Sequence, residues 1–124
     1  MAITDHFERK LDDKNRMTIP VELRHEFGDG EVVVTRGFGK YLHIYPKSVW
    51  DEQMEPKLKG DILSEEVANL NVKFRTGRTV SKMDTKQGRI TIEQHLLEFA
   101  DIDKAVVAVR SGEFWRVTAK EHFE

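Results

Sequence analysis

The sequence predicts an α+β fold in which eight short strands close on themselves into one barrel, with short helices around it. Three observations support this prediction. The chain has 124 residues, of which 39% are hydrophobic and 34% are charged, which suits one globular domain. Its apolar residues alternate between strand-like and short helical patterns. The second half of the chain also repeats the first half.

The internal repeat keeps one register over a long stretch. Identical residues recur in pairs: Arg16/Arg89, Thr18/Thr91, Ile19/Ile92, Leu23/Leu96, Val33/Val106, Val34/Val107, Gly39/Gly112 and Lys47/Lys120. We place the copies at 5–50 and 78–123 of a single domain, 1–124, joined by a helical connector at 51–77. One copy is too short to close a core, so the two are expected to complete each other. Closure into a barrel also removes exposed strand edges.

The first copy begins with a strand, a turn and a second strand. Phe7, Arg9 and Leu11 alternate with polar neighbours, as in a half-buried strand. Residues 12–15 predict a turn, because Asp and Asn side chains bond to the nearby backbone and Asn accepts a positive φ. Residues 17–19 begin the second strand.

A short helix and a β-hairpin follow. Pro20 suits the first helical position, and Gly28 suits a helix end. Residues 31–36 are strand-like, and the glycines of 37–39 turn the chain back into a strand at 41–45. The second copy predicts the same order: strands at 80–83 and 89–92, a helix ending near residue 100, and a hairpin of 105–110 and 114–118.

The connector is predicted to be helical. Pro46 leads into a helix at 47–54, which Pro56 interrupts. Ser64 is a good N-cap for a second helix, and Gly77 can end it. The apolar side chains of this second helix form one stripe: Val67, Leu70 and Phe74. This stripe either packs on the barrel or forms a contact face for a neighbouring subunit.

Composition excludes several classes of protein. Cysteine is absent, which excludes disulfides, thiolate metal sites and a cysteine nucleophile. No apolar run is long enough to span a bilayer, and residues 1–20 contain no apolar signal core, so we expect a cytoplasmic protein without a membrane partner. The 20 basic and 22 acidic residues give a net charge of −2. A nucleic-acid reader of this composition needs its basic residues gathered on one face.

Two motifs resemble a known family. Residues 11–20, Leu-Asp-Asp-Lys-Asn-Arg-Met-Thr-Ile-Pro, resemble the first signature of the MraZ family, bacterial regulators encoded at the head of the division and cell-wall gene cluster. Residues 83–90 resemble its second signature, and 33–37 and 42–46, followed by Trp50, also resemble the family's first half. The resemblance implies two AbrB-like swapped-hairpin halves in one chain. It further implies nucleoid-associated, ring-shaped homo-oligomers that bind repeated DNA boxes upstream of their own operon and repress it.

The chain departs from the family pattern inside both motifs. Asn15 stands where glycine is common, which is a mild change because both residues accept a positive φ. The second motif is one residue longer than the first. Either Asp84 or Thr85 therefore takes the place of the motif aspartate that precedes Arg89.

The chemistry of the two motifs predicts binding to double-stranded DNA. Arginine is a planar fork that can grip a guanine edge with two hydrogen bonds, and lysine is a point charge suited to phosphate. The predicted DNA-binding residues are Arg9, Lys14, Arg16, Lys82, Lys86 and Arg89. Asp12 and Asp84 are predicted to orient the two motif arginines. Alternatively, Asp12 and Arg16 form an ion pair that only closes the turn and binds no partner molecule.

Catalysis is not expected. The five histidines, His6, His25, His43, His95 and His122, are widely separated and lack metal-ligand spacing. We therefore predict no catalytic residues, no metal, no cofactor and no small-molecule substrate. The alternative function is an antitoxin-like protein-binding module, or a structural oligomerisation module, without specific DNA binding.

Overall fold

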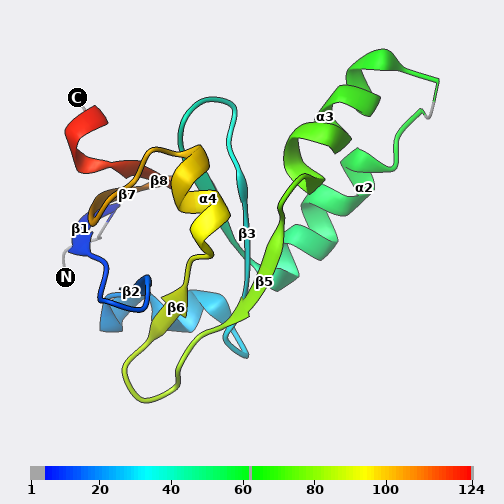
Figure 1. Ribbon diagram of the computed structural model, residues 1–124. Coiled ribbons are helices and arrows are strands. Elements are labelled where there is room, and N and C mark those ends of the chain that lie inside the picture. Colours follow the sequence, from blue (N-terminus) through cyan, green and yellow to red (C-terminus); the bar gives the residue numbers. More distant parts are fainter. Residues whose placement is uncertain (1–4, 62, 124) are drawn as a thin grey trace.

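The computed structural model describes residues 5–61 and 63–123, and it has the predicted α+β architecture. Antiparallel strands and short helices form a body, from which a helical arm projects (Figure 1). The arm is the connector between the two halves of the chain.

The first half of the body follows the predicted order of elements. It contains β1 (His6–Lys10), β2 (Arg16–Thr18), the helix η1 (Val21–Phe27), β3 (Glu31–Arg36) and β4 (Leu42–Pro46). The helix after Pro20 is a 3₁₀ helix, and it buries Leu23 and Phe27 in the body. Pro20 lies at the N-cap position, directly before the helix, and not at the first helical position as predicted.

The second half has the same order of strand, strand, helix and hairpin. It contains β5 (Thr79–Lys82), β6 (Arg89–Thr91), α4 (Gln94–Phe99), β7 (Ala105–Ser111), β8 (Phe114–Ala119) and the short 3₁₀ helix η3 (Lys120–His122). The predicted division into two repeats of one domain stays a prediction, which this shared order supports.

Strand pairing joins the two halves to each other. Six strands form an antiparallel sheet in the order β1-β7-β8-β4-β3-β5, and β2 pairs with β6 in a separate two-stranded ribbon. This order is symmetric. The strands β1, β3 and β4 correspond to β5, β7 and β8, and replacing each strand by its counterpart gives the same order in reverse. The hairpin β3–β4 lies within the first half and the hairpin β7–β8 within the second. The other four ladders pair strands of different halves. Each half therefore depends on the other for most of its strand pairing.

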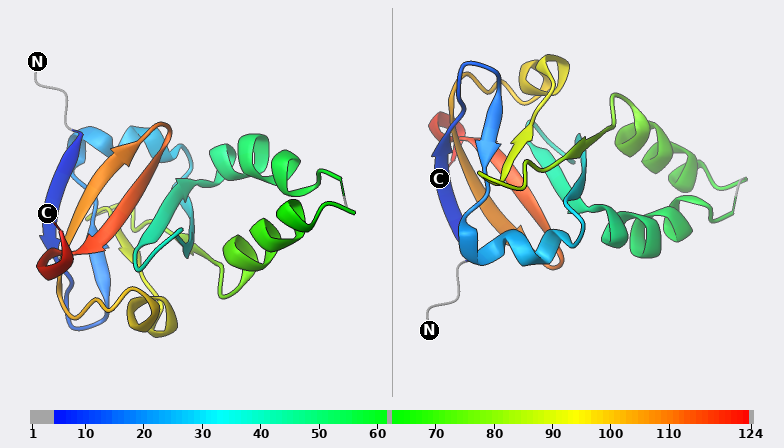
Figure 2. Two further views of the ribbon diagram at one scale, coloured as in Figure 1. Left: turned by 90° about the horizontal axis from the view of Figure 1, so that it is seen from above. Right: turned by 90° about the horizontal axis from the view of Figure 1, so that it is seen from below.

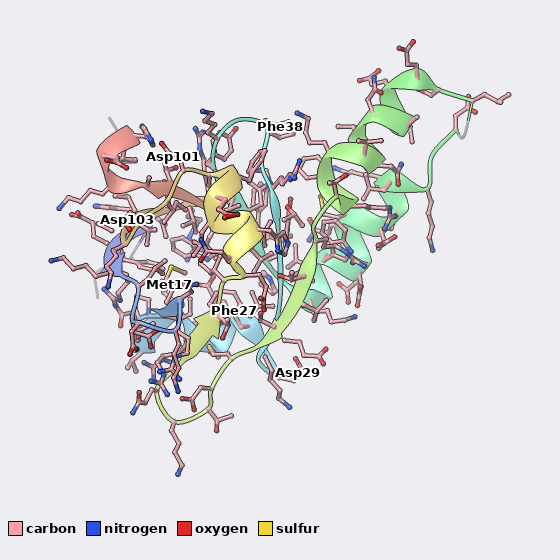
Figure 3. All side chains as sticks on the ribbon, in the orientation of Figure 1. Met17, Phe27, Asp29, Phe38, Asp101 and Asp103 are labelled. Carbon is pink, nitrogen blue, oxygen red and sulfur yellow. The ribbon has the colours of Figure 1, made fainter. Side chains whose placement is uncertain are left out.

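The main core lies inside the body and draws on both halves. Its fully buried members include Met17, Ile19, Leu42 and Ile44 from the first half and Ile90, Ile92, Leu96 and Val117 from the second. Figure 3 labels Met17 and Phe27, two of its side chains. Burying one such side chain stabilises the fold by roughly 1.5–3 kcal/mol, so the two halves stabilise each other through packing as well as pairing.

The prediction that Pro56 interrupts the first helix of the arm is wrong. The segments α1 (Lys47–Val49), η2 (Trp50–Met54) and α2 (Glu55–Leu58) follow one another without a gap. Pro56 lies in the first turn of α2, and η2 before it is a π-helix. The missing proline N–H is tolerated there, because the wider π turn already departs from the α-helical hydrogen-bond pattern.

The chain returns through α3 (Glu65–Arg75), which lies beside the outgoing helices of the arm (Figure 2). Ser64 caps α3 as predicted, because its Oγ accepts a hydrogen bond from the backbone N–H of Val67 at 3.3 Å. Arg75 donates two hydrogen bonds to the Glu55 carboxylate, at 2.9 and 2.8 Å, and these bonds lower the pKa of Glu55 to about 2. Within 5–61 and 63–123, no helix has the length and apolar character needed to cross a membrane.

The apolar stripe of α3 packs within the protein. Phe74 is buried in a second core cluster, and Leu70 lies against it. The other buried members of this cluster come from the strands and from the outgoing helices: Val33, Tyr45, Trp50 and Leu58. Packing, the first of the two predicted roles of the stripe, is therefore confirmed for Leu70 and Phe74.

Candidate nucleic-acid interface

The ribbon of β2 and β6 presents both motif arginines on one face. Arg16 pairs with Thr91, and Thr18 pairs with Arg89, so these four residues share the same side of the ribbon. Between them Met17 pairs with Ile90, and both side chains are buried in the core on the opposite side. Alternation along two short strands therefore turns Arg16 and Arg89 outward together.

The first turn holds Arg16 through Asp12. Asp12 Oδ1 accepts hydrogen bonds from the backbone N–H groups of Lys14 and Arg16, both at 2.9 Å. Asp12 Oδ2 accepts a third from Arg16 Nε at 2.7 Å. Asn15 adopts the positive φ of 58° that the sequence suggested it could accept. The turn is thus closed by the aspartate that also positions the arginine.

The second turn repeats this arrangement with one extra residue. Asp84 Oδ1 accepts the backbone N–H of Lys86 at 2.9 Å, and Asp84 Oδ2 accepts Arg89 Nη2 at 2.9 Å. Asp84, and not Thr85, therefore occupies the place of the motif aspartate. Gly88 takes the left-handed position with a φ of 65°, and its N–H bonds to Asp84 O at 2.7 Å, which closes the longer turn.

The two turns also share charge across the ribbon. Arg89 Nη1 lies 4.0 Å from Asp12 Oδ2, so Asp12 faces one arginine from each half, Arg16 and Arg89. Burial raises the pKa of Asp12, but the hydrogen bonds from Arg16 and Lys14 outweigh this effect and hold it below its ordinary value. The hydrogen bonds from the Lys86 backbone and the Arg89 side chain likewise lower the pKa of Asp84. Both carboxylates are therefore ionised at neutral pH.

The arginines differ in the donors that they leave free. Arg16 uses Nε for Asp12, and among the described residues its two terminal amino groups have no hydrogen-bond partner. Arg89 uses Nη2 for Asp84, has Nη1 near Asp12, and buries Nε without a partner. The guanidinium of Arg16 is therefore more available to a ligand than that of Arg89.

The other predicted basic residues are divided between free and engaged side chains. Lys14 and Lys86 are exposed in the two turns, at opposite ends of the antiparallel ribbon, and Lys82 is exposed at the end of β5. Arg9 is half-buried, and its Nε donates to the backbone oxygen of Thr18 at 3.0 Å. The structure thus gives Arg9 an internal role in joining β1 to β2.

Arg24 is a residue of this region that the sequence motifs did not reveal. It lies in η1, and its guanidinium donates to the backbone oxygens of Ile19 and Gln87, both at 2.9 Å. A side chain at Gly88 would overlap with this guanidinium. Arg24 therefore fastens the second turn to the first half of the body, a contact that sequence spacing could not indicate.

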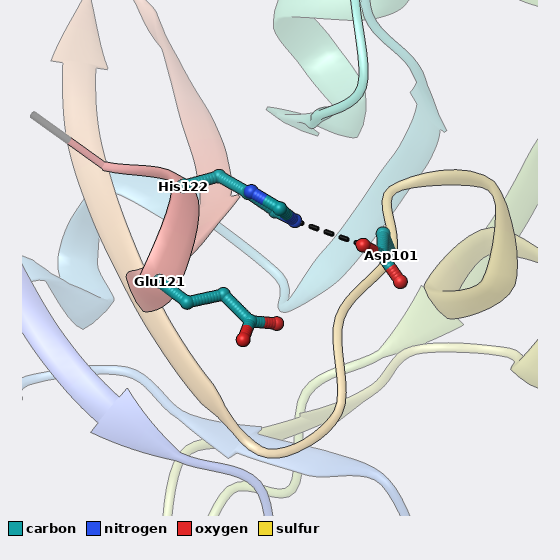
Figure 4. Close-up of side chains that lie close together, drawn as sticks. All are labelled: Asp101, Glu121 and His122. Carbon is teal, nitrogen blue, oxygen red and sulfur yellow. Dashed lines mark hydrogen bonds and ion pairs between the residues drawn. The ribbon is translucent and has the colours of Figure 1, made fainter.

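One cluster of side chains could hold a metal ion, and it lies outside the ribbon. Among the described residues, Asp101, Glu121 and His122 are the group whose ligand atoms come within 4.8 Å of one another (Figure 4). His122 Nε2 lies 2.9 Å from Asp101 Oδ2. The histidine spacing missed this group because its members come from distant parts of the chain. All three side chains are exposed, and exposed carboxylates commonly lie close together without an ion.

These features define a class of protein. It is a small α+β protein in which two similarly ordered halves pair with each other and carry aspartate–arginine turns on a two-stranded ribbon whose outward side chains are half-buried. The family model that matches residues 2–69 is described as "MraZ protein, putative antitoxin-like".

Named relatives match almost the whole chain. The protein named "Transcriptional regulator MraZ" of Roseiflexus sp. (strain RS-1) is 40% identical over 112 residues, which cover 88% of this chain and 77% of the relative. The proteins of the same name from Clostridium acetobutylicum and Oenococcus oeni are each 34% identical, covering 93% and 95% of this chain and 80% and 81% of their own lengths. The chain therefore belongs to the MraZ family, and the name of these relatives describes regulation rather than catalysis.

Proposed function

We propose that this protein is a sequence-specific DNA-binding transcriptional regulator and that the ribbon of β2 and β6 is its DNA-contacting surface. The observation that carries the proposal is the placement of Arg16 and Arg89 on one outward face, each held by the aspartate of its own turn. A guanidinium that is already held in position before DNA arrives loses less conformational freedom when it binds. The name shared by the relatives, transcriptional regulator, supports this function.

The ribbon suits the major groove of DNA. That groove admits a two-stranded β-ribbon, and an arginine fork can bond to guanine O6 and N7 together. The free terminal amino groups of Arg16 make it the main candidate for base recognition. Arg89 reads a base edge or grips phosphate, while Lys14, Lys82 and Lys86 contact phosphates as exposed point charges. Arg9 contributes charge from its half-buried position beside the ribbon.

The proposal includes closure of the eight strands into a barrel of two swapped-hairpin halves. Side-chain bonds connect the ribbon to both edge strands of the six-stranded sheet. Arg9 on β1 donates to Thr18 O on β2 at 3.0 Å, and Ser81 on β5 donates to Thr91 O on β6 at 2.9 Å. These bonds support closure through the ribbon, which would hold the DNA-contacting face rigidly.

Oligomerisation is the next part of the proposal. One copy offers few phosphate contacts, and the chain carries a net charge of −2, so a single ribbon binds weakly. A homo-oligomeric ring carries several ribbons and can engage successive DNA boxes, which raises affinity by roughly 10²–10⁴. The proposed targets are repeated boxes upstream of the protein's own division and cell-wall operon, which the ring represses at the nucleoid.

Fluorescence anisotropy tests this function. The protein is titrated against labelled DNA from upstream of its own gene and against a scrambled duplex, each at several salt concentrations. We expect tighter binding to the native duplex, with a steep salt dependence. Arg16→Ala should weaken binding to the native duplex. Its matched control is Lys57→Ala, because Lys57 is an exposed cation on the arm and lies outside the ribbon. This substitution should leave the affinity unchanged.

Two other outcomes would redirect the assignment. Equal binding to both duplexes would indicate a non-specific DNA-binding protein. Absence of binding to either duplex would favour the antitoxin-like, protein-binding alternative, which matches the wording of the family description.

A further inference from the structure

A groove lies where the arm joins the body. It has a volume of about 570 Å³ and runs between the β3–β4 loop and α3. Its apolar lining includes Phe38, Val72 and Phe99, and its basic lining comprises Arg36, Lys40 and Lys73. Phe38 is 60% exposed and Val72 is 68% exposed. Figure 3 places Phe38 at the other end of the body from the strands labelled β2 and β6 in Figure 1.

Within the part of the chain that the structure describes, the basic side chains of the groove lack acidic partners. Across the described residues, no carboxylate lies within ion-pair distance of Arg36, Lys40 or Lys73. The Arg36 guanidinium lies 4.6 Å from the centre of the Phe99 ring, and its Nε is buried without a hydrogen-bond partner. A groove with an apolar floor and unpaired cations fits a ligand that carries an apolar side chain between carboxylates.

The tip of the arm carries that combination. Leu63 is 90% exposed, and the neighbouring acidic residues Asp61, Glu65 and Glu66 are exposed as well. The tip lies far from the sheet in all three ribbon views (Figures 1 and 2). An exposed leucine with acidic residues on both sides of it in the sequence is complementary to the groove in both charge and polarity.

We propose that the tip of the arm of one copy docks into the groove of the next copy. This inference rests on the ring assembly proposed above and names the two surfaces that build it. Tip and groove are different surfaces, so the contact is head-to-tail, and such a contact closes a ring when the rotation between neighbouring copies divides a full turn. Because the groove and the ribbon lie at different ends of the body, docking leaves every ribbon free to meet DNA.

Two variants test the surfaces separately, one in the tip and one in the groove. Leu63→Lys removes the apolar side chain of the tip and places a cation against the basic groove. Val72→Glu places a carboxylate in the groove, where it repels the acidic tip. Glutamate is a better helix former than valine, so the second change suits α3. Val21→Glu is the matched control, since Val21 is 71% exposed and lies on η1, away from both tip and groove.

Sedimentation velocity at micromolar concentration measures the result, with circular dichroism to confirm folding. We expect wild type and Val21→Glu to form one closed oligomer and each docking variant to sediment as a monomer. An equimolar mixture of the two docking variants should form a heterodimer and nothing larger, because Val72→Glu keeps its tip and Leu63→Lys keeps its groove.

Two results would overturn the docking. If both variants kept the wild-type oligomer, or if their mixture stayed monomeric, the tip and groove would not be the interface, and the ring could still form through other surfaces. A monomeric wild type would overturn the ring and the docking together. The ribbon assignment would then still be decided by the anisotropy titration, which needs no oligomer to detect the loss caused by Arg16→Ala.

Discussion

Each half of the chain contains an aspartate–arginine turn, but the two turns leave different numbers of arginine hydrogen-bond donors available. In the first turn Asp12 binds Arg16 through Nε, and the terminal amino groups of Arg16 stay free among the described residues. In the second turn Asp84 binds Arg89 through a terminal amino group, and Arg24 fastens the turn from outside. Both aspartates bond to the backbone N–H two residues further on. Motif geometry is thus kept while the number of available donors changes.

This comparison shows how a longer loop can preserve a site. The extra residue of the second turn is accommodated by the left-handed Gly88, whereas the first turn uses the left-handed Asn15. Arg24 has no matching role in the other half, where the equivalent position is the buried Leu97. The second turn is therefore the more firmly held, and the first is the more available to a ligand. Three predictions test this difference, and a fourth compares another pair of equivalent positions, His43 and Arg116.

The largest effect is expected at Gly88. Gly88→Ala strains a left-handed residue and displaces the Arg24 guanidinium, so it should lower the free energy of unfolding by about 3 kcal/mol, summing a positive-φ penalty and two lost hydrogen bonds. Asn15→Ala should lower it by only about 1 kcal/mol, because asparagine already has a Cβ and alanine therefore adds no atom beside the first turn. Urea unfolding measures both. Equal losses would show that Arg24 does not distinguish the turns.

The next effect compares His43 with Arg116, which pair across β4 and β8 at equivalent positions of the two halves. Burial, together with the charge of Arg116, lowers the pKa of His43 to about 4. The unfolded chain therefore binds the proton first, and stability falls as pH drops from about 6.5 to 4. Between pH 7 and 4.5 the loss at this site should be roughly 2–3 kcal/mol.

Urea unfolding at the two pH values, with His43→Asn as the comparison, isolates this contribution. The variant keeps a polar atom near the Tyr45 hydroxyl, which lies 2.9 Å from His43 Nδ1. Its stability should vary less with pH than that of wild type. An unchanged pH dependence would assign the acid sensitivity to other groups.

The DNA affinities of Arg16→Ala and Arg89→Ala give the direct functional comparison. Arg16→Ala should weaken binding to the native duplex by about 1–3 kcal/mol, since it removes the freer fork. Arg89→Ala should cost less, because its fork is largely engaged by Asp84 and Asp12. Anisotropy titrations measure both, and unfolding curves check that each variant is folded. Equal losses would contradict the predicted dominance of the first motif.

The smallest effect is expected from the turn lysines. Lys14→Ala and Lys86→Ala should each reduce affinity for native and scrambled duplexes alike, and each should reduce the slope of log affinity against log salt by about 0.9 per ribbon engaged. The two variants should behave alike, because both lysines are exposed at equivalent places in their turns. A sequence-specific loss for either lysine would instead indicate contact with a base edge.

Much of the site could be predicted because its signals are local. Asp, Asn and Gly at fixed offsets specify turns, and the alternation around Met17 and Ile90 specifies which side chains turn outward. The sequence leaves the second turn open between Asp84 and Thr85, because spacing alone does not tell which side chain reaches the arginine. The prediction that Pro56 interrupts the helix is wrong for a similar reason, since the π-helical segment before it has no simple sequence signature.

Local sequence patterns specify the α+β class, the order of the strands along the chain and the placement of aspartate before arginine in each half. The pairing of β1 with β7, the contact of Arg24 with the second turn, and the groove that Arg36, Lys40 and Lys73 line beside Phe38 arise only when the chain is folded. The two groups of features differ in the range of the interactions that produce them. Turn and strand preferences act over a few residues, whereas pairing partners are selected by the burial of one core that both halves must fill.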